Sequence, residues 1–269
     1  MIKLIVTDLD GTFLNNHHTF NKEYFVRVHD QLKEKGMTFV ACTGKQCERV
    51  EALFDGIGED IWILGDSATR IKKAGQVIKD FTIEHGIAMQ AINEIDAFAS
   101  DVSIIACTRN AAYVHSSINE GAYKMVRGSY EKVIKVDHFT EIEGEVLKIT
   151  VYDDKGRSSH LRKHVESSLL NQIYIVDSEA NWLDITALGV HKGETVKVIQ
   201  SMLNVSKEET VSFGDGENDV ELMDIASYSF AVNNACENTK RAAQYVMKLT
   251  NDQDGVLHTI EALLNLNEK

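Results

Sequence analysis

The chain of 269 residues carries a net charge of −13, and 43% of its residues are hydrophobic and 26% are charged. This acidic balance argues against a nucleic-acid partner, because binding a phosphate backbone requires patches of Lys and Arg. No apolar run reaches the ~18 residues of a transmembrane helix, and the N-terminal segment already turns acidic at Asp8, too early for a secretory signal, so we expect a cytoplasmic protein without a membrane partner.

The N-terminal part of the chain alternates short apolar strands with amphipathic helices. Strands are predicted at 2–7, 37–41 and 61–64, and helices at 21–35 and 45–55. Strands that are apolar on both faces are typical of a parallel, doubly wound sheet. A hairpin is predicted next, over residues 69–81.

The middle of the chain has closely spaced strands in which polar and apolar residues alternate more. Strands are predicted at 102–107, 111–115, 146–152, 172–177 and 181–186, and helices at 86–98, 119–127 and 157–170. This pattern favours an antiparallel sheet covered by helices, which is an α+β unit.

After Gly189 the first pattern returns. Helices are predicted at 192–203, 218–226, 235–243 and 253–264, and strands at 211–213, 228–232 and 245–248. The simplest arrangement is an α/β core, a Rossmann-like doubly wound parallel sheet, that is interrupted by an α+β domain. We assign residues 1–82 and 187–269 to the discontinuous core and residues 83–186 to the inserted domain.

Two carboxylates follow the first predicted strand directly. Asp8 and Asp10 are two positions apart, so in an extended segment they project to the same side. They lie at the carboxyl end of a strand, where open α/β sheets bind ligands, and Gly11 lets the chain turn away sharply. Adjacent carboxylates repel each other, and a divalent cation is their usual compensation. The structural alternative is an ordinary turn at the end of a strand.

A second acidic cluster, Gly214–Asp219, also follows a short buried strand and opens a helix. It supplies further oxygen ligands from Asp215, Asn218 and Asp219. Asn218 or Asp219 can also cap the helix, but a cap does not explain Asp215. Two acidic clusters at strand ends of one sheet indicate a site for a hard cation, and oxygen ligands favour Mg²⁺.

Two weaker signals lie at other strand and helix ends. Thr43 and Gly44 follow the second strand, where a hydroxyl and backbone amides can hold a phosphoryl oxygen, although Thr-Gly is also a routine turn. Lys192 opens the helix after the inserted unit, where a cation opposes the helix dipole. This placement suits a lysine that faces an anion, and the alternative is a solvated surface lysine.

Four segments in this order resemble the motifs of the haloacid dehalogenase-like hydrolase superfamily: Asp8–Thr12 (DLDGT), Thr43–Lys45 (TGK), His191–Gly193 (HKG) and Gly214–Asp219 (GDGEND). The domain inserted between the second and third motifs resembles the type IIB cap of the Cof-type phosphatases. The late segment Asn251–Val256 also resembles that subgroup. The resemblance covers essentially the whole chain.

The resemblance implies a chemical role for each motif. Asp8 would be the nucleophile that forms an aspartyl-phosphate. Asp10 would protonate the leaving oxygen and then deprotonate the attacking water. Thr43 and Gly44 would bind the transferring phosphoryl group together with these acids, and Lys192 would neutralise charge on the phosphate and on Asp8.

The resemblance also implies the ligands of a magnesium ion. These would be the side chain of Asp8, the backbone carbonyl of Asp10 and the side chain of Asp215. Asp219 would lie behind these ligands, and Asn218 would lie near the phosphate.

The family resemblance therefore implies a magnesium-dependent phosphomonoester hydrolase. Its substrates would be small phosphorylated metabolites, with sugar phosphates expected first and phosphorylated cofactors second. Closure of the cap would exclude water and select the leaving group, and Asp177, Glu179 and Trp182 are candidates to line the cap's substrate face. The alternatives are a phosphomutase or phosphotransferase with the same nucleophile, or a non-catalytic metabolite-binding regulator with the same fold.

Three positions depart from the pattern of the subgroup. Lys45 stands where arginine is common, Asp66-Ser67 where Asn-Gly is usual, and Asn233-Asn234 where Gly-Asn is frequent. A lysine cannot make the bidentate contacts of an arginine. We expect these positions to lie around the pocket mouth and to alter substrate preference rather than the phosphoryl chemistry. The pair His17-His18 is expected to be solvated.

Overall fold

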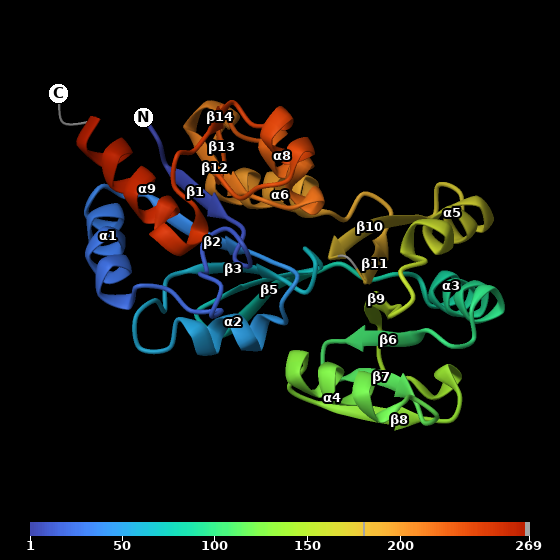
Figure 1. The fold of residues 1–269 in the computed structure, drawn as a ribbon. Helices are drawn as coiled ribbons and strands as arrows, with labels where there is room; N and C mark the ends of the chain where they lie inside the picture. The colour runs from blue at the N-terminus through green and yellow to red at the C-terminus, as the bar shows by residue number, and fades with distance from the viewer. Residues whose placement is uncertain (180, 267–269) are drawn as a thin grey trace.

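The computed structural model of the protein describes residues 1–179 and 181–266, and it contains two sheets flanked by helices (Figure 1). The N- and C-terminal parts of the chain build the larger sheet, and the middle of the chain builds the smaller one. This confirms the predicted α/β core with an inserted α+β unit, whereas the domain boundaries at 82/83 and 186/187 stay predictions. Within the described residues, no helix combines the length and the apolar character needed to cross a bilayer.

The larger sheet has the strand order β14-β13-β12-β1-β2-β3-β4-β5. The strands from β14 to β3 pair in parallel, and β4 and β5 form the predicted antiparallel hairpin. The strands are β1 (Leu4–Thr7), β2 (Thr38–Cys42), β3 (Trp62–Gly65), β4 (Arg70–Lys73), β5 (Gln76–Asp80), β12 (Thr210–Gly214), β13 (Tyr228–Ala231) and β14 (Tyr245–Val246).

Both faces of the parallel sheet are buried under helices. In β1, Ile5 packs into one hydrophobic cluster, whereas Leu4 and Val6 pack into another on the opposite face. The first face is covered by α1 (Lys22–Glu34), α2 (Cys47–Leu53) and α9 (Gly255–Leu266), and the second by α6 (Lys192–Leu203), α7 (Val220–Asp224) and α8 (Glu237–Ala242). Burial on both sides explains why these strands are apolar throughout.

Four short 3₁₀ turns complete the elements of the described residues: η1 (Phe139–Glu141), η2 (Lys207–Glu209), η3 (Glu217–Asp219) and η4 (Asn251–Gln253). One of them corrects a predicted helix. The helix expected at 218–226 is split into η3 and the shorter α7. The acidic motif therefore lies on the tight turn itself.

The smaller sheet has the strand order β10-β11-β9-β6-β7-β8. Its elements are α3 (His85–Phe98), β6 (Ser103–Thr108), β7 (Ala112–His115), α4 (Glu120–Ser129), β8 (Val133–Val136), β9 (Val146–Tyr152), α5 (Ser158–Ser168), β10 (Ile173–Glu179) and β11 (Trp182–Ala187). The prediction missed β8, which is short and half-exposed, and it missed the parallel pairing of β7 with β8. The chain passes from β7 through α4 to β8, and such a crossover through a helix makes the two strands parallel.

The two faces of the smaller sheet differ in composition. Ile149 and Leu183 belong to the hydrophobic cluster under α3 and α5. Successive residues of a strand point to opposite faces, so Lys148 and Thr150 of β9 lie on the other face, where Thr150 pairs across the ladder with Asp184 of β11. On this face Ile105 and Cys107 of β6 pack with α4, whereas Lys148 reaches a carbonyl oxygen of the loop after β2. The polar part of the face therefore meets the larger sheet.

Candidate active site

Three neighbouring strands bring the predicted site residues together. β1 lies between β12 and β2, so Asp8, Asp215 and Thr43 each follow one of three adjacent parallel strands. The N–H of Asp8 donates to the carbonyl oxygen of Phe213 at 3.0 Å, which extends the ladder into the site. Parallel strands end at the same edge of a sheet, which is why acidic clusters so distant in the sequence meet here.

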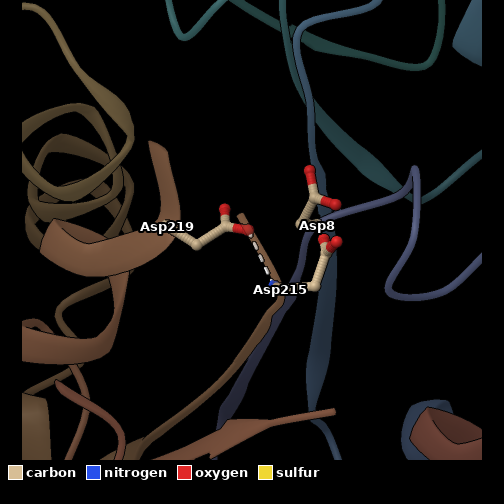
Figure 2. Close-up of side chains that lie close together, drawn as sticks. All are labelled: Asp8, Asp215 and Asp219. Atoms are coloured by element: carbon tan, nitrogen blue, oxygen red, sulfur yellow. Dashed lines mark hydrogen bonds between the residues drawn. The ribbon is translucent and has the colours of Figure 1, made fainter. Parts of the chain in front are cut away.

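Lys192 connects two buried carboxylates. Its Nζ lies 2.7 Å from Oδ1 of Asp8 and 2.6 Å from Oδ1 of Asp219. Oδ2 of Asp219 accepts the N–H of Asp215 at 2.9 Å (Figure 2) and the N–H of Gly216 at 3.0 Å. The solvated alternative for Lys192 is therefore wrong, since only 4% of the residue is exposed. Asp219 also holds the turn in the manner of a cap, which is the structural role considered for it.

The loop of the first motif holds Asp215 in place. Thr12 donates its hydroxyl to Oδ1 of Asp215 at 2.7 Å. Gly11 has a φ of +76°, and a Cβ atom built on it would lie 2.4 Å from Oδ2 of Asp215. The glycine is thus required twice, by its left-handed backbone and by the close approach of the carboxylate.

The acidic groups of the site are short of positive charge. Burial raises the pKa of Asp8 well above its usual value; Lys192 opposes this shift, and Asp219 and Asp215 reinforce it. Burial and the neighbouring Asp219 raise the pKa of Asp215 to about 6. Lys192 supplies one positive charge against three carboxylates, so a further cation would stabilise the ionised site.

The chemistry of the donor atoms fits a hard divalent cation. One oxygen from each of Asp8, Asp215 and Asp219 lies within 4.8 Å of the others (Figure 2). Asp219 already uses both oxygens on Lys192 and on backbone N–H groups. Asp8 and Asp215 therefore remain as the candidate side-chain ligands, and carboxylate oxygens are what Mg²⁺ prefers.

Replacing Gly11 by alanine should disturb the fold and this pair of ligands together. We expect Gly11→Ala to lower the free energy of unfolding by roughly 2–3 kcal/mol, because the backbone is strained and the methyl group collides with Asp215. Urea denaturation measures the loss. Gly36→Ala is the matched control, since Gly36 has a φ of +67° but no neighbouring atom within 4 Å, and it should cost only about 1 kcal/mol. Equal losses in the two variants would contradict the collision.

Asp10 is held by two side chains at the edge of the site. Nζ of Lys45 lies 2.8 Å from Oδ1 of Asp10, and Nδ1 of His18 lies 3.2 Å from the same oxygen. Lys45, which replaces the common arginine, therefore pairs with the predicted acid. The expectation for His18 is only half right, because its side chain is 74% exposed but contacts Asp10.

These groups line one cavity of about 780 Å³. Its lining includes the predicted residues Asp8, Asp10, Thr43, Gly44, Asp215 and Asn218. The smaller sheet and its connections add Tyr130, Lys148, Thr150, Trp182 and Asp184, and the segment around α2 adds Gln46 and Arg49. The cavity therefore has a floor of predicted site residues and a wall from the inserted unit.

The sequence patterns did not predict most of the residues by which the inserted unit lines the cavity. The signal was present in Val146–Tyr152 (VLKITVY), where Lys148 and Thr150 interrupt an apolar strand at every second position. Trp182 lines the cavity as expected, whereas Asp177 pairs with Arg162 at 3.3 Å. The side chain of Glu179, a further candidate, lies outside the described part of the chain.

In two of the three departures, one side chain holds backbone groups of neighbouring segments. Asp66 is buried, and its Oδ2 accepts the N–H of Cys47 at 3.1 Å. Asn234 donates to the carbonyl oxygen of Gly11 at 2.7 Å and accepts the N–H of Asn251 at 3.1 Å. Neither residue is part of the cavity lining that the structure describes. Lys45 lines the cavity, and Ser67 and Asn234 contact residues that line it, namely Lys148 and Gly11. The expectation that all three departures lie around the pocket mouth therefore stays a prediction.

An acid-lined sheet edge under an inserted domain defines an α/β enzyme with a capped site. A sequence profile of the haloacid dehalogenase-like hydrolases matches residues 5–260, so the chain belongs to this family. The predicted Cof-type membership with a type IIB cap is confirmed, and within the family the protein is a phosphatase.

Three known proteins illustrate the similarity. The 5-amino-6-(5-phospho-D-ribitylamino)uracil phosphatase YbjI of Escherichia coli is 28% identical over 98% of this chain and 96% of its own length. The crystal structure of SMU.1108c from Streptococcus mutans UA159 matches with a TM-score of 0.94 at 26% identity, over 98% of this chain and 100% of that one. The subclass IIB sugar phosphatase BT4131 shares the fold, with a TM-score of 0.81 at 21% identity over 97% and 98% of the two chains.

Proposed function

We propose that this protein is a magnesium-dependent phosphomonoester hydrolase that acts on small phosphorylated metabolites through an aspartyl-phosphate at Asp8. The observation that carries the proposal is that Asp8 and Asp215 line the cavity together, while the buried Lys192 contacts Asp8. A nucleophilic carboxylate, a cation in contact with it and a second carboxylate for a metal ion are what phosphoryl transfer requires.

The side chains of Asp8 and Asp215 and the backbone carbonyl of Asp10 would hold Mg²⁺. When bound, the ion neutralises charge on the phosphoryl oxygens and on the nucleophile. Asp219 keeps Lys192 and the Asp215 loop in position through three hydrogen bonds. Lys192 orients the Asp8 carboxylate and favours its ionised form against the effect of burial.

In the first half-reaction the carboxylate of Asp8 attacks phosphorus and the bond to the ester oxygen breaks. Asp10 donates a proton to the departing oxygen, which leaves as an alcohol. In the second half-reaction Asp10 takes a proton from water, the water oxygen attacks phosphorus, and Asp8 is released with inorganic phosphate. Lys45 and His18 hold Asp10 in the cavity lining, where it would carry out both proton transfers.

Thr43, Gly44 and Asn218 would bind the phosphoryl oxygens that do not react. All three line the cavity beside Asp8. The hydroxyl oxygen of Thr43 accepts the N–H of Lys45 at 3.1 Å, which leaves its own proton available for an anion. Such hydrogen bonds stabilise charge only when the donors are already in place.

Within this proposal, residues 83–186 form the cap and residues 1–82 and 187–269 form the catalytic core. Lys148, Asp184 and Trp182 of this cap line the same cavity as Asp8, and such a polar lining suits a hydroxyl-bearing leaving group. Sugar phosphates are therefore proposed first and phosphorylated cofactors second. The E. coli relative is named as the phosphatase of a compound with a phosphoribityl group. This name supports a polyol phosphate as the substrate. The cytoplasmic location and the lack of a nucleic-acid partner stay predictions.

Phosphate release from a panel of phosphorylated metabolites tests the function. We expect inorganic phosphate as the product, with the highest kcat/KM for a sugar or polyol phosphate. Interconversion of sugar-phosphate isomers without phosphate release would favour a phosphomutase. Metabolite binding without turnover in the presence of Mg²⁺ would favour a regulator.

Removal of divalent metal should stop turnover. Because Asp8 and Asp215 lose their compensating charge, we expect activity to disappear in excess EDTA and to return when Mg²⁺ is added in excess. Phosphate release measures the activity, and far-ultraviolet circular dichroism in EDTA checks that the fold persists. Full turnover after exhaustive chelation would contradict the metal assignment.

A further inference from the structure

A buried lysine of the inserted unit reaches into the loop that carries the phosphate-binding residues. Lys148 of β9 is 3% exposed, and its Nζ donates to Oγ of Ser67 at 2.8 Å and to the carbonyl oxygen of Gly44 at 3.2 Å. Gly44 follows Thr43 directly. Lys148 therefore connects the second sheet with the carboxyl edge of the first.

Asp184 balances the charge of Lys148 within the same sheet. Its nearer oxygen lies 3.8 Å from Nζ of Lys148 and accepts the hydroxyl of Thr150 at 2.6 Å. Its other oxygen accepts the hydroxyl of Ser67. Ser67, which stands at one of the departures noted in the sequence, thus bridges the two charges. Burial alone would lower the pKa of Lys148, but Asp184 and the other anionic groups around it together raise this pKa above its usual value, so the ammonium stays protonated.

The inserted unit also contacts the segment 43–49 at two later positions. Oε1 of Gln46 accepts the N–H of Glu131 at 2.9 Å, and Nη2 of Arg49 donates to the carbonyl oxygen of Tyr130 at 3.4 Å. Together with the bond from Lys148 to Gly44, the segment meets the unit at three points. The same segment carries Thr43 and Lys45, which face the phosphoryl site.

The peptide bond between Gly44 and Lys45 couples the contact with Lys148 on one side of the loop to Thr43 and Lys45 on the other side. A trans peptide is planar, and its C=O and N–H groups point in opposite directions. Lys148 fixes the carbonyl of Gly44, and Oγ1 of Thr43 accepts the N–H of Lys45. The orientation of this peptide group therefore fixes the orientation of the Thr43 hydroxyl and the position of the Lys45 backbone. Nζ of Lys45 in turn holds Asp10.

We propose that Lys148 is a positioning residue that completes the phosphate loop when the inserted unit is closed, by holding the Gly44 carbonyl and through it Thr43, Lys45 and the acid Asp10. The inference rests on the proposed function. The inference adds a second effect of cap closure, beyond the exclusion of water. The reactive arrangement of the loop depends on one ammonium group from the cap.

The test compares Lys148→Met with the double variant Lys148→Met/Asp184→Asn. The single variant leaves a buried carboxylate unpaired, whereas the double variant removes both charges and should fold as the wild type does. We expect the double variant to stay 10- to 100-fold below the wild type in kcat/KM, the order that misplaced catalytic groups cost. Recovery of the wild-type value in the double variant would show that Lys148 only neutralises Asp184, and it would overturn the proposal.

Two substrates separate positioning from general damage. Ribose 5-phosphate has an alkoxide leaving group that needs a proton from Asp10, whereas p-nitrophenyl phosphate releases a phenolate that does not. If Lys148 acts through Lys45 and Asp10, the loss in kcat/KM is several-fold larger for ribose 5-phosphate. Equal losses for the two substrates would contradict this route.

Hydrogen–deuterium exchange of the segment 43–49 gives a readout that does not depend on activity. Exchange should speed up in the double variant, because the carbonyl of Gly44 has lost its donor. Lys155→Met is the matched control, since Lys155 is an exposed lysine of the same unit that pairs with Asp101. Unchanged exchange would overturn the inference even if the protein proved not to be a phosphatase, whereas turnover in Asp8→Asn would affect the proposed function alone.

Discussion

Replacing Asp8 by asparagine is expected to abolish turnover, with a loss in kcat on the order of 10⁴- to 10⁶-fold. The amide is nearly the same size as the carboxylate, but it is a poor nucleophile and provides no charge for a metal ion. Phosphate release from the best substrate of the panel measures the loss. Brief incubation with a phosphorus-labelled substrate followed by acid quenching should trap label on the wild type and none on Asp8→Asn.

Asp154→Asn is the matched control for this experiment, because Asp154 is an exposed carboxylate of the inserted unit. It should retain wild-type turnover and labelling. Turnover by Asp8→Asn at a tenth of the wild-type rate or faster would remove Asp8 as the nucleophile, and the reaction would need another group. Loss of turnover with label still trapped would move the covalent step to a different residue.

Replacing Lys192 by methionine should damage both stability and activity. Asp8 and Asp219 each lose a charged partner within 2.7 Å in a buried site. Breaking a buried ion pair from one side costs about 3–5 kcal/mol, since the remaining charge has neither water nor a partner. We expect a loss of this size in urea denaturation without metal, and a kcat lower by about 10³-fold or more.

The double variant Lys192→Met/Asp219→Asn separates the two effects. It removes one buried negative charge along with the lysine, so much of the stability should return while kcat stays low. Lys197→Met serves as the control, because Lys197 lies on the same helix but its side chain is 54% exposed. If the double variant regained activity as well, Lys192 would serve only to stabilise the fold.

The carboxylates of the site could be predicted because their positions follow from strand ends. Asp8 and Asp215 each come directly after an apolar strand, and the carboxyl ends of neighbouring parallel strands meet at one edge. The prediction needed only the strand type and the family order of the motifs. The role of Asp219 was less accessible, because η3 makes a tight turn and returns its carboxylate to the N–H groups of Asp215 and Gly216.

The wall of the cavity shows where sequence reasoning stopped. Alternation in β9 and β11 places Lys148, Thr150 and Asp184 on one face of a strand pair. It does not say whether that face meets solvent or the other sheet, because the answer depends on how the two units pack. The strand β8 was missed for a related reason, since its short, half-exposed run is stabilised by pairing with β7 rather than by its own pattern.

The sequence by itself determined the order of the elements, the two-unit architecture and the acidic residues at the strand ends. These follow from local patterns, namely hydrophobic periodicity and the residues that come directly after each strand. Only the tertiary structure decided that Lys192 is buried between Asp8 and Asp219, that Lys45 and His18 hold Asp10, and that Lys148 reaches Gly44. Such contacts join side chains across two sheets, and their partners are set by packing and charge compensation in space rather than by spacing along the chain.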